Sequence, residues 1–161
     1  MLFRRFPAPA LHDPRRSPLA PDELYAVRGA ARAVSRAAQA GDVEGRTARF
    51  ADLRAVLAEV RRRRGDHPLL WELEADFTSD PAAAADLYRR AETAAADAGL
   101  PTLSVRLSLA RLLLKELGCP GKARAVLLAC SEELPAATDK QAAAWEQLLA
   151  ACERHLDTKR P

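Results

Sequence analysis

Residues 103–135 read LSVRLSLARLLLKELGCPGKARAVLLACSEELP, and this stretch decides the fold. The arm before the Gly-Cys-Pro-Gly break is apolar on almost every side. Its one polar stripe has spacings of 4, 3 and 4 and comprises Ser104, Ser108, Arg111 and Lys115. This periodicity predicts a helix that is buried nearly all round. In the second arm, apolar and small residues recur at helical spacing, at Ala123, Val126, Leu127, Cys130 and Leu134. The stretch therefore predicts a helical hairpin that closes on proline.

Outside the hairpin, prolines, glycines and N-cap residues divide the chain into further segments with one apolar face each. These segments predict helices over about 21–40, 43–64, 69–77, 81–98 and 138–157. Together with the two arms of the hairpin they make seven helices. Alanine, leucine, arginine and glutamate dominate, and aromatic residues are only 5% of the chain, so almost no strand is expected. The fold class is predicted to be all-α.

The 161 residues are expected to form one domain with two flanking segments. Residues 1–20 are predicted to be a proline- and arginine-rich N-terminal arm. Residues 21–157 are predicted to be a single helical-repeat domain, and residues 158–161 a frayed tail.

Charge and cysteine usage restrict the expected partners and compartment. Arginine outnumbers lysine by 21 to 4, which we attribute to the codon bias of a GC-rich bacterial genome, so it is weak evidence for nucleic-acid binding. Residues 1–66 carry 14 basic and 8 acidic groups, a modest excess that solvated helix faces also explain. The three cysteines are odd in number and follow no secretory segment, which favours free thiols in the cytoplasm. No apolar run is long enough for a membrane span.

The hairpin resembles a tetratricopeptide repeat. The glycine, alanine, large apolar, small and proline positions of that family are matched in order by Gly118, Ala123, Leu127, Cys130 and Pro135. The predicted middle hairpin has matching residues at Ala84, Tyr88 and Ala91. The first hairpin has Gly41-Asp42 at the turn between its two helices. The resemblance covers roughly residues 22–157. It implies a right-handed stack of three antiparallel helix hairpins plus a C-terminal capping helix, with a concave surface that binds protein segments.

A partner-binding surface is predicted on the first helix of each hairpin. Helix periodicity places charged residues on the exposed sides of these helices, at Arg28, Arg32, Arg36, Glu72, Asp76, Arg111 and Lys115. If the stack has the expected hand, the three faces adjoin and form a concave surface that is basic, acidic and basic again. Such a surface suits a protein partner of mixed charge better than a duplex phosphate backbone.

Catalytic and metal-binding patterns are weak. Glu72 and Asp76 share a helix face at i and i+4, but no histidine joins them. Cys152 and His155 are two residues and do not make a metal site, and His12 lies in the proline-rich arm. No glycine-rich phosphate loop is present. We therefore expect no enzyme, no cofactor and no metal.

The expected function is a non-enzymatic protein–protein interaction module that binds a specific partner in its groove. Small bacterial proteins of this kind often resemble immunity proteins that neutralise a cognate toxin or effector, which is the favoured reading. A secretion-system chaperone or adaptor is one alternative. A nucleic-acid-binding helical protein is another, although the aromatic residues expected to stack on bases fall on core stripes instead, at Phe50, Trp71, Tyr88 and Trp145.

Overall fold

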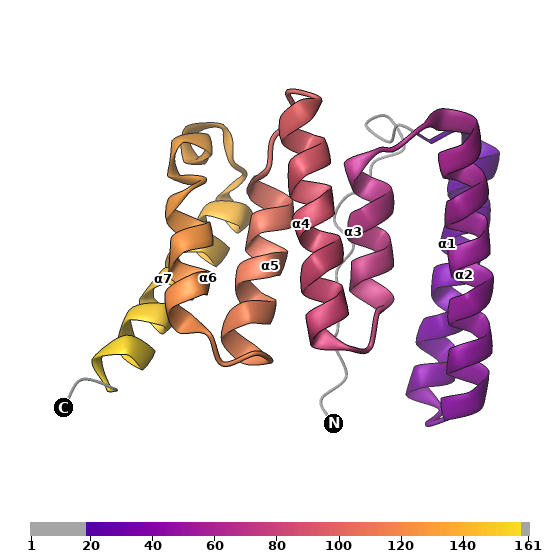
Figure 1. The fold of residues 1–161 in the computed structure, drawn as a ribbon, viewed down its shortest axis with the longest axis horizontal. Coiled ribbons are helices and arrows are strands. Elements are labelled where there is room, and N and C mark those ends of the chain that lie inside the picture. The colour runs from indigo at the N-terminus through magenta and orange to yellow at the C-terminus, as the bar shows by residue number, and fades with distance from the viewer. Residues whose placement is uncertain (1–18, 159–161) are drawn as a thin grey trace. The chain divides into compact units, whose positions relative to one another are not determined.

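The computed structural model describes residues 19–158, which form seven α-helices and one 3₁₀ helix and contain no strand (Figure 1). The elements are α1 (Pro21–Gln39), α2 (Val43–Arg64), α3 (Pro68–Phe77), α4 (Pro81–Asp97), α5 (Leu103–Lys115), α6 (Pro120–Leu128), the 3₁₀ helix η2 (Ser131–Ala136) and α7 (Asp139–Asp157). The all-α prediction is confirmed. The described range excludes residues 1–18 of the predicted arm and residues 159–161 of the predicted tail.

Local signals in the sequence place most helix ends correctly. The Asp80 carboxylate accepts hydrogen bonds from the amides of Ala82 and Ala83, both at 3.2 Å, and so caps α4. Thr138 and Gln141 form the predicted capping box of α7, because each side chain accepts a hydrogen bond from the other's amide. Gly99 follows α4 at φ 64°, a left-handed conformation that residues with a Cβ rarely adopt.

The first helix begins with a cap supplied from inside the helix. The N-cap residue is Ala20, which has no side-chain acceptor, and the Glu23 carboxylate instead accepts a hydrogen bond from the Ala20 amide at 2.9 Å. Leu19 and Leu24 are both buried in the same apolar cluster, the arrangement of a hydrophobic staple. Leu19, which the sequence analysis assigned to the arm, therefore packs in the core.

The described residues fall into two compact units that divide after Phe77. In the first unit, α1 and α2 pack against each other and α3 packs on α2. Their shared core includes Val27, Val34, Leu53, Leu57 and Leu70, each at most 1% exposed. In the second unit, α5 packs against α4, α6 and α7.

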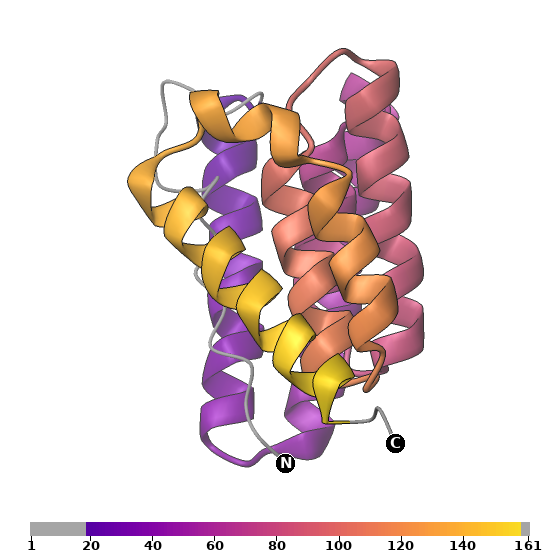
Figure 2. The same ribbon diagram turned by 90° about the vertical axis from the view of Figure 1, so that its left-hand side faces the viewer.

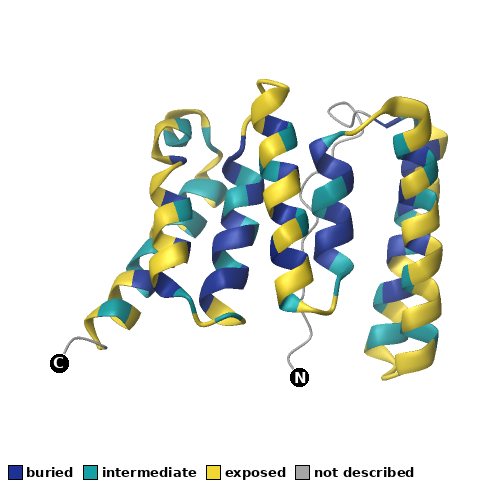
Figure 3. Ribbon diagram, viewed as in Figure 1, coloured by how far each residue is buried: buried dark blue, intermediate teal, exposed yellow. Residues whose placement is uncertain are grey.

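Helix α5 is buried nearly all round, as predicted, with eight of its thirteen residues buried (Figure 3). Its polar stripe is only half-exposed apart from Lys115, which is exposed. Arg106 lies off that stripe and is also half-buried, because its Nε donates to the Glu92 carboxylate of α4 at 2.8 Å. The sequence analysis missed this ion pair because Glu92 belongs to another helix.

The second arm differs from the prediction, because α6 ends at Leu128 and does not continue to Pro135. The Trp145 indole Nε1 donates to the Leu127 carbonyl at 2.8 Å, and the Ser131 hydroxyl donates to the Leu128 carbonyl at 2.9 Å. These side chains help to satisfy the last carbonyls of α6, together with the Cys130 amide, which donates to the Leu127 carbonyl at 3.2 Å. Pro135 has no amide hydrogen and cannot donate within a helix. Residues 131–136, which include this proline, form the 3₁₀ helix η2.

Two long-range contacts hold the end of the second unit together. The Glu133 carboxylate in η2 accepts hydrogen bonds from the Thr102 and Leu103 amides at 2.8 and 2.9 Å, which caps α5 from a distant segment. Helix α7 lies obliquely across α5 and α6, as Figure 2 shows, and the Trp145 hydrogen bond attaches it to α6. The capping role predicted for α7 stays a prediction.

The helix order is compatible with a helical repeat. The first predicted hairpin, α1 with α2, and the third, α5 with α6, are each formed by helices in contact. The two helices of the middle hairpin, α3 and α4, belong to different units. The complete right-handed stack with one concave surface stays a prediction.

Truncation of Leu127 should destabilise the second unit. Leu127 is fully enclosed, at 0% exposed, whereas its neighbour Leu128 is 40% exposed. Leu127→Ala should lower the free energy of unfolding by roughly 2–5 kcal/mol, because it removes buried methyl groups and leaves a cavity. Leu128→Ala is the matched control and should lower it by less than about 1 kcal/mol. Denaturant unfolding followed by circular dichroism measures both, and equal effects would contradict the packing described.

Candidate functional site

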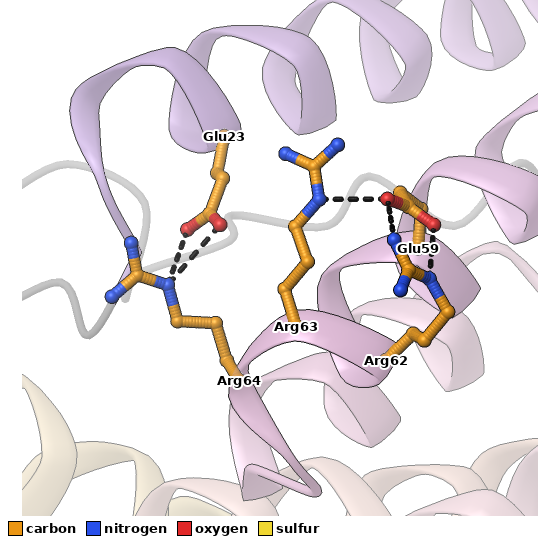
Figure 4. Close-up of polar contacts among 5 residues, drawn as sticks. All are labelled: Glu23, Glu59, Arg62, Arg63 and Arg64. Carbon is orange, nitrogen blue, oxygen red and sulfur yellow. Dashed lines mark hydrogen bonds and ion pairs between the residues drawn. The ribbon is translucent and has the colours of Figure 1, made fainter.

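The four arginines that end α2 are engaged by carboxylates, so they are not a free basic patch. Arg62 makes two hydrogen bonds to the Glu59 carboxylate at 2.7 and 2.9 Å, and the Arg63 Nε donates to the same carboxylate at 2.7 Å (Figure 4). These bonds, with Arg62 the larger cause, lower the pKa of Glu59 to about 2. The Arg64 Nε donates to both oxygens of Glu23 at the start of α1, at 3.0 and 3.1 Å.

The fourth of these arginines, Arg61, takes part in a half-buried cluster between α2 and α3. The Glu74 carboxylate is buried and accepts from Arg61 Nη2 at 2.8 Å and from Arg54 Nε at 3.1 Å. The Arg61 guanidinium also lies 3.8 Å from the centroid of the Trp71 ring, a cation–π contact. Arg61 Nη2 donates to the Leu70 carbonyl as well, at 3.1 Å. This cluster joins the two helices and leaves Glu74 unavailable for chemistry.

The arginines of α1 differ from the other arginines of the first unit. Residues 19–77 contain ten arginines and ten carboxylates, and seven of the arginines have a hydrogen-bond partner in this range. The other three are Arg28, Arg32 and Arg36, for which residues 19–158 provide no ion pair. They are four residues apart, so each is a neighbour of the next on the helix surface. Like charges at this spacing destabilise a helix by about 0.2–0.5 kcal/mol per pair.

Two further residues complete this side of α1. Tyr25 is 82% exposed, and its hydroxyl has no hydrogen-bond partner within residues 19–158. Gly29 is in the middle of the helix at a negative φ, and a Cβ added there would meet nothing within 4 Å. A glycine inside a helix costs about 1 kcal/mol relative to alanine, and no contact in the described chain requires it. We call the five residues Tyr25, Arg28, Gly29, Arg32 and Arg36 the α1 face.

Exposure of the predicted partner-binding residues varies. Arg32, Arg36 and Lys115 are exposed, as predicted, while Arg28, Glu72 and Arg111 are half-buried. The prediction that Asp76 is on an exposed side is wrong, because this residue is only 7% exposed. Since α1 and α3 belong to one unit and α5 to the other, a single surface formed by all seven residues stays a prediction.

Sequence reasoning missed two members of the α1 face. Tyr25 falls outside the buried positions of α1, which are occupied by Leu24, Val27, Ala31 and Val34 among others, so its exposure could have been noticed. Gly29 also lies off these positions. A large aromatic residue and a glycine on the exposed side of a helix were the available signals.

The catalytic and metal-binding candidates are not brought together. Cys152 is buried, which raises the pKa of its thiol, whereas His155 is exposed with Nδ1 at 2.8 Å from the Ala151 carbonyl. Glu72 is half-buried beside the engaged Glu74, and His12 lies outside the described residues. Residues 19–158 contain no group of three or more histidine, cysteine or acidic side chains placed to hold a metal ion.

The ion pairs of Glu59 should persist to strongly acidic pH. Because its pKa falls from 4.5 to about 2 in the folded state, the pairs stabilise the fold above pH 4.5, and this contribution is lost as the pH falls toward 2. Carbon-detected NMR of the side-chain carboxyl should give a midpoint near pH 2 in the native chain. The midpoint should rise in Arg62→Gln. A native midpoint near 4.5 would contradict the pairing in Figure 4.

Replacing Gly29 by alanine should stabilise the fold. The position is helical, φ is negative and the added Cβ has free space, so the change removes the helix penalty of glycine without a clash. The free energy of unfolding should increase by roughly 0.5–1 kcal/mol. Thermal or urea unfolding measures this change, and Ala33→Gly in the same helix should produce the opposite shift. A loss of stability in Gly29→Ala would show that this glycine has a structural role within the chain.

We compared the chain with protein families, curated proteins and solved structures. No protein-family model, curated protein or solved structure matches the chain. The helices described also include none that is both long and apolar enough to cross a membrane. Residues 19–158 form an all-helical structure that is compatible with a helical repeat.

Proposed function

We propose that this chain is a non-enzymatic protein–protein interaction module and that the α1 face contacts its partner. The observation that carries the proposal is the contrast between paired and unpaired arginines. On α2 the exposed arginines Arg49, Arg62 and Arg63 have carboxylates within the same helix, whereas those of α1 have none among residues 19–158. A protein violates its own local preferences mainly at functional sites. The unpaired cations favour a partner that supplies carboxylates.

The composition of the face supports a protein partner. Tyrosine and arginine, together with tryptophan, are enriched among the residues that dominate the binding energy of protein interfaces. An exposed tyrosine offers a large apolar ring at low conformational cost, and its hydroxyl can bond to a partner. Tyr25 and the neighbouring guanidinium groups of α1 combine these properties on one helix.

Within this class, we favour an immunity protein that neutralises a cognate bacterial toxin or effector, with a secretion-system chaperone or adaptor as the alternative. We further propose that the chain acts in the cytoplasm, which its free cysteines support: Cys130 and Cys152 are buried and Cys119 is half-buried. The absence of an enzymatic role is supported by the engagement of Glu74 in two ion pairs.

Nucleic-acid binding is the weaker candidate. Arginines and carboxylates balance in residues 19–77, whereas a phosphate-binding surface needs a basic excess. Of the aromatic residues that could stack on bases, Tyr88 is buried, and Phe50, Trp71 and Trp145 are half-buried. Among residues 19–158, Tyr25 alone is an exposed aromatic residue beside arginines, which provides one stacking position and no series of them.

Charge reversal on the α1 face should weaken partner binding without unfolding the chain. Arg32→Glu with Arg36→Glu should weaken binding at least tenfold, about 1.4 kcal/mol, because both side chains are exposed and unpaired. The first partner to test is the protein encoded by the adjacent gene, by pull-down followed by calorimetry.

The matched control for this experiment is Arg49→Glu with Arg89→Glu. It changes the net charge equally at two exposed arginines that have partners in their own helices, Asp52 and Asp86. The control should bind within about twofold of the parent. If the α1 double variant binds its partner as tightly as the parent, the α1 face is not the contact surface.

A further inference from the structure

We infer that the partner element bound by the α1 face is an acidic α-helix that packs closely over Gly29. The inference rests on the proposed function and names the kind of structure that the partner presents. Three observations carry it: the spacing of the arginines, the free space at Gly29 and the charge of the face.

The spacing of the cations matches carboxylates on a helix. Arg28, Arg32 and Arg36 are four residues apart, so their attachment points advance by about 6 Å each along α1. Carboxylates at i, i+4 and i+8 of a partner helix advance by the same amount and stay in register with all three. In an extended segment, alternate side chains advance by about 6.6–6.8 Å, so the mismatch exceeds 1 Å by the third arginine.

The surface beside the arginines allows a helix to come close. Gly29 has no side chain, and nothing lies within 4 Å of the position that its Cβ would take. Ala26 and Ala33 flank it three and four residues away, and both are accessible. Packed helix axes are usually 8–10 Å apart, and small residues at the contact permit the shorter distance. This use explains why a glycine that weakens α1 is present where no contact within residues 19–158 requires one.

Tyr25 and the arginines lie around Gly29 on the surface of α1. Tyr25 is one turn before Gly29, and Arg32 and Arg36 are about one and two turns after it on the same exposed side. A partner helix that crosses at Gly29 can pack an apolar residue on the Tyr25 ring and direct its carboxylates toward the arginines. Where the close contact excludes water, the Coulombic attraction between these charges is stronger than at a solvent-exposed site.

Charge favours a different protein over a second copy of this chain as the occupant. In a symmetric pair of α1 helices, the face of each copy would bring three arginines and one nearby exposed carboxylate, Asp22, against the same set. The net positive charge on both sides opposes this pairing. A helix rich in glutamate or aspartate has the complementary charge.

A designed peptide tests the inference. The probe is a labelled 22-residue helix with glutamates at i, i+4 and i+8, leucines on the adjacent stripe and lysines on the far side. A second peptide is identical except that two central residues are replaced with prolines, which prevent a helix. Fluorescence anisotropy measures the affinity of both for the full chain. The helical peptide should bind at least tenfold more tightly than the proline peptide.

Variants of the chain separate close packing from charge. Gly29→Leu should weaken binding of the helical peptide at least tenfold, because its side chain fills the crossing point, and Gly29→Ala should have a smaller effect. Both substitutions are compatible with a helix and with the free space at this position. Arg32→Glu should also weaken binding at least tenfold, and the matched control Arg49→Glu less than twofold.

Each failure has a distinct meaning. If Arg32→Glu weakens binding but Gly29→Leu or the proline peptide does not, the inference is overturned while an acidic partner for the α1 face stands. If the helical peptide does not bind at millimolar concentration, or if a 20-base-pair DNA duplex binds more tightly, the inference is also overturned. Sedimentation that shows a dimer lost in Gly29→Leu would assign the face to a second copy. If Arg32→Glu leaves peptide binding unchanged, the proposed function itself fails at this face.

Discussion

The pairing of arginine with carboxylate is the constraint on which the first unit depends. Its clearest case is Glu74, whose buried charge is held by Arg54 and Arg61 from the neighbouring helix. Removing Glu74 would leave the mostly buried Arg61 guanidinium without a carboxylate partner, which is unfavourable where water is largely excluded. The contact therefore fixes how α3 packs on α2. The arginines of α1 differ from Arg54 and Arg61 because they have no carboxylate partner among residues 19–158.

Local sequence signals were enough to predict the helices. Prolines at first-turn positions, the Asp80 and Thr138 caps and the glycines after helices act within a few residues, so their effects can be deduced without a tertiary structure. The end of α6 could not be deduced in this way. It depends in part on a hydrogen bond from Trp145, which lies 18 residues further along the chain.

The same distinction applies to the candidate site. The exposure of Arg32 and Arg36 follows from helix periodicity and was predicted. That Arg64 is paired was not predictable, because its partner Glu23 is 41 residues away and approaches only when α1 packs on α2. The burial of Asp76 likewise follows from tertiary structure, since its helical position alone predicts exposure. Sequence analysis thus identified charged faces, and packing determined which of their charges were left unpaired.

The two tryptophans give the chain an optical property that follows from its two units. Trp71 lies in the first unit beneath the Arg61 guanidinium, and Trp145 lies in the second with its indole hydrogen-bonded to a carbonyl. Each unit therefore contains one tryptophan, and the two indole rings have different electrostatic environments. In chains with either tryptophan replaced by phenylalanine, the tryptophan emission reports on one unit alone. Unfolding of the two halves can thus be followed separately without an attached dye.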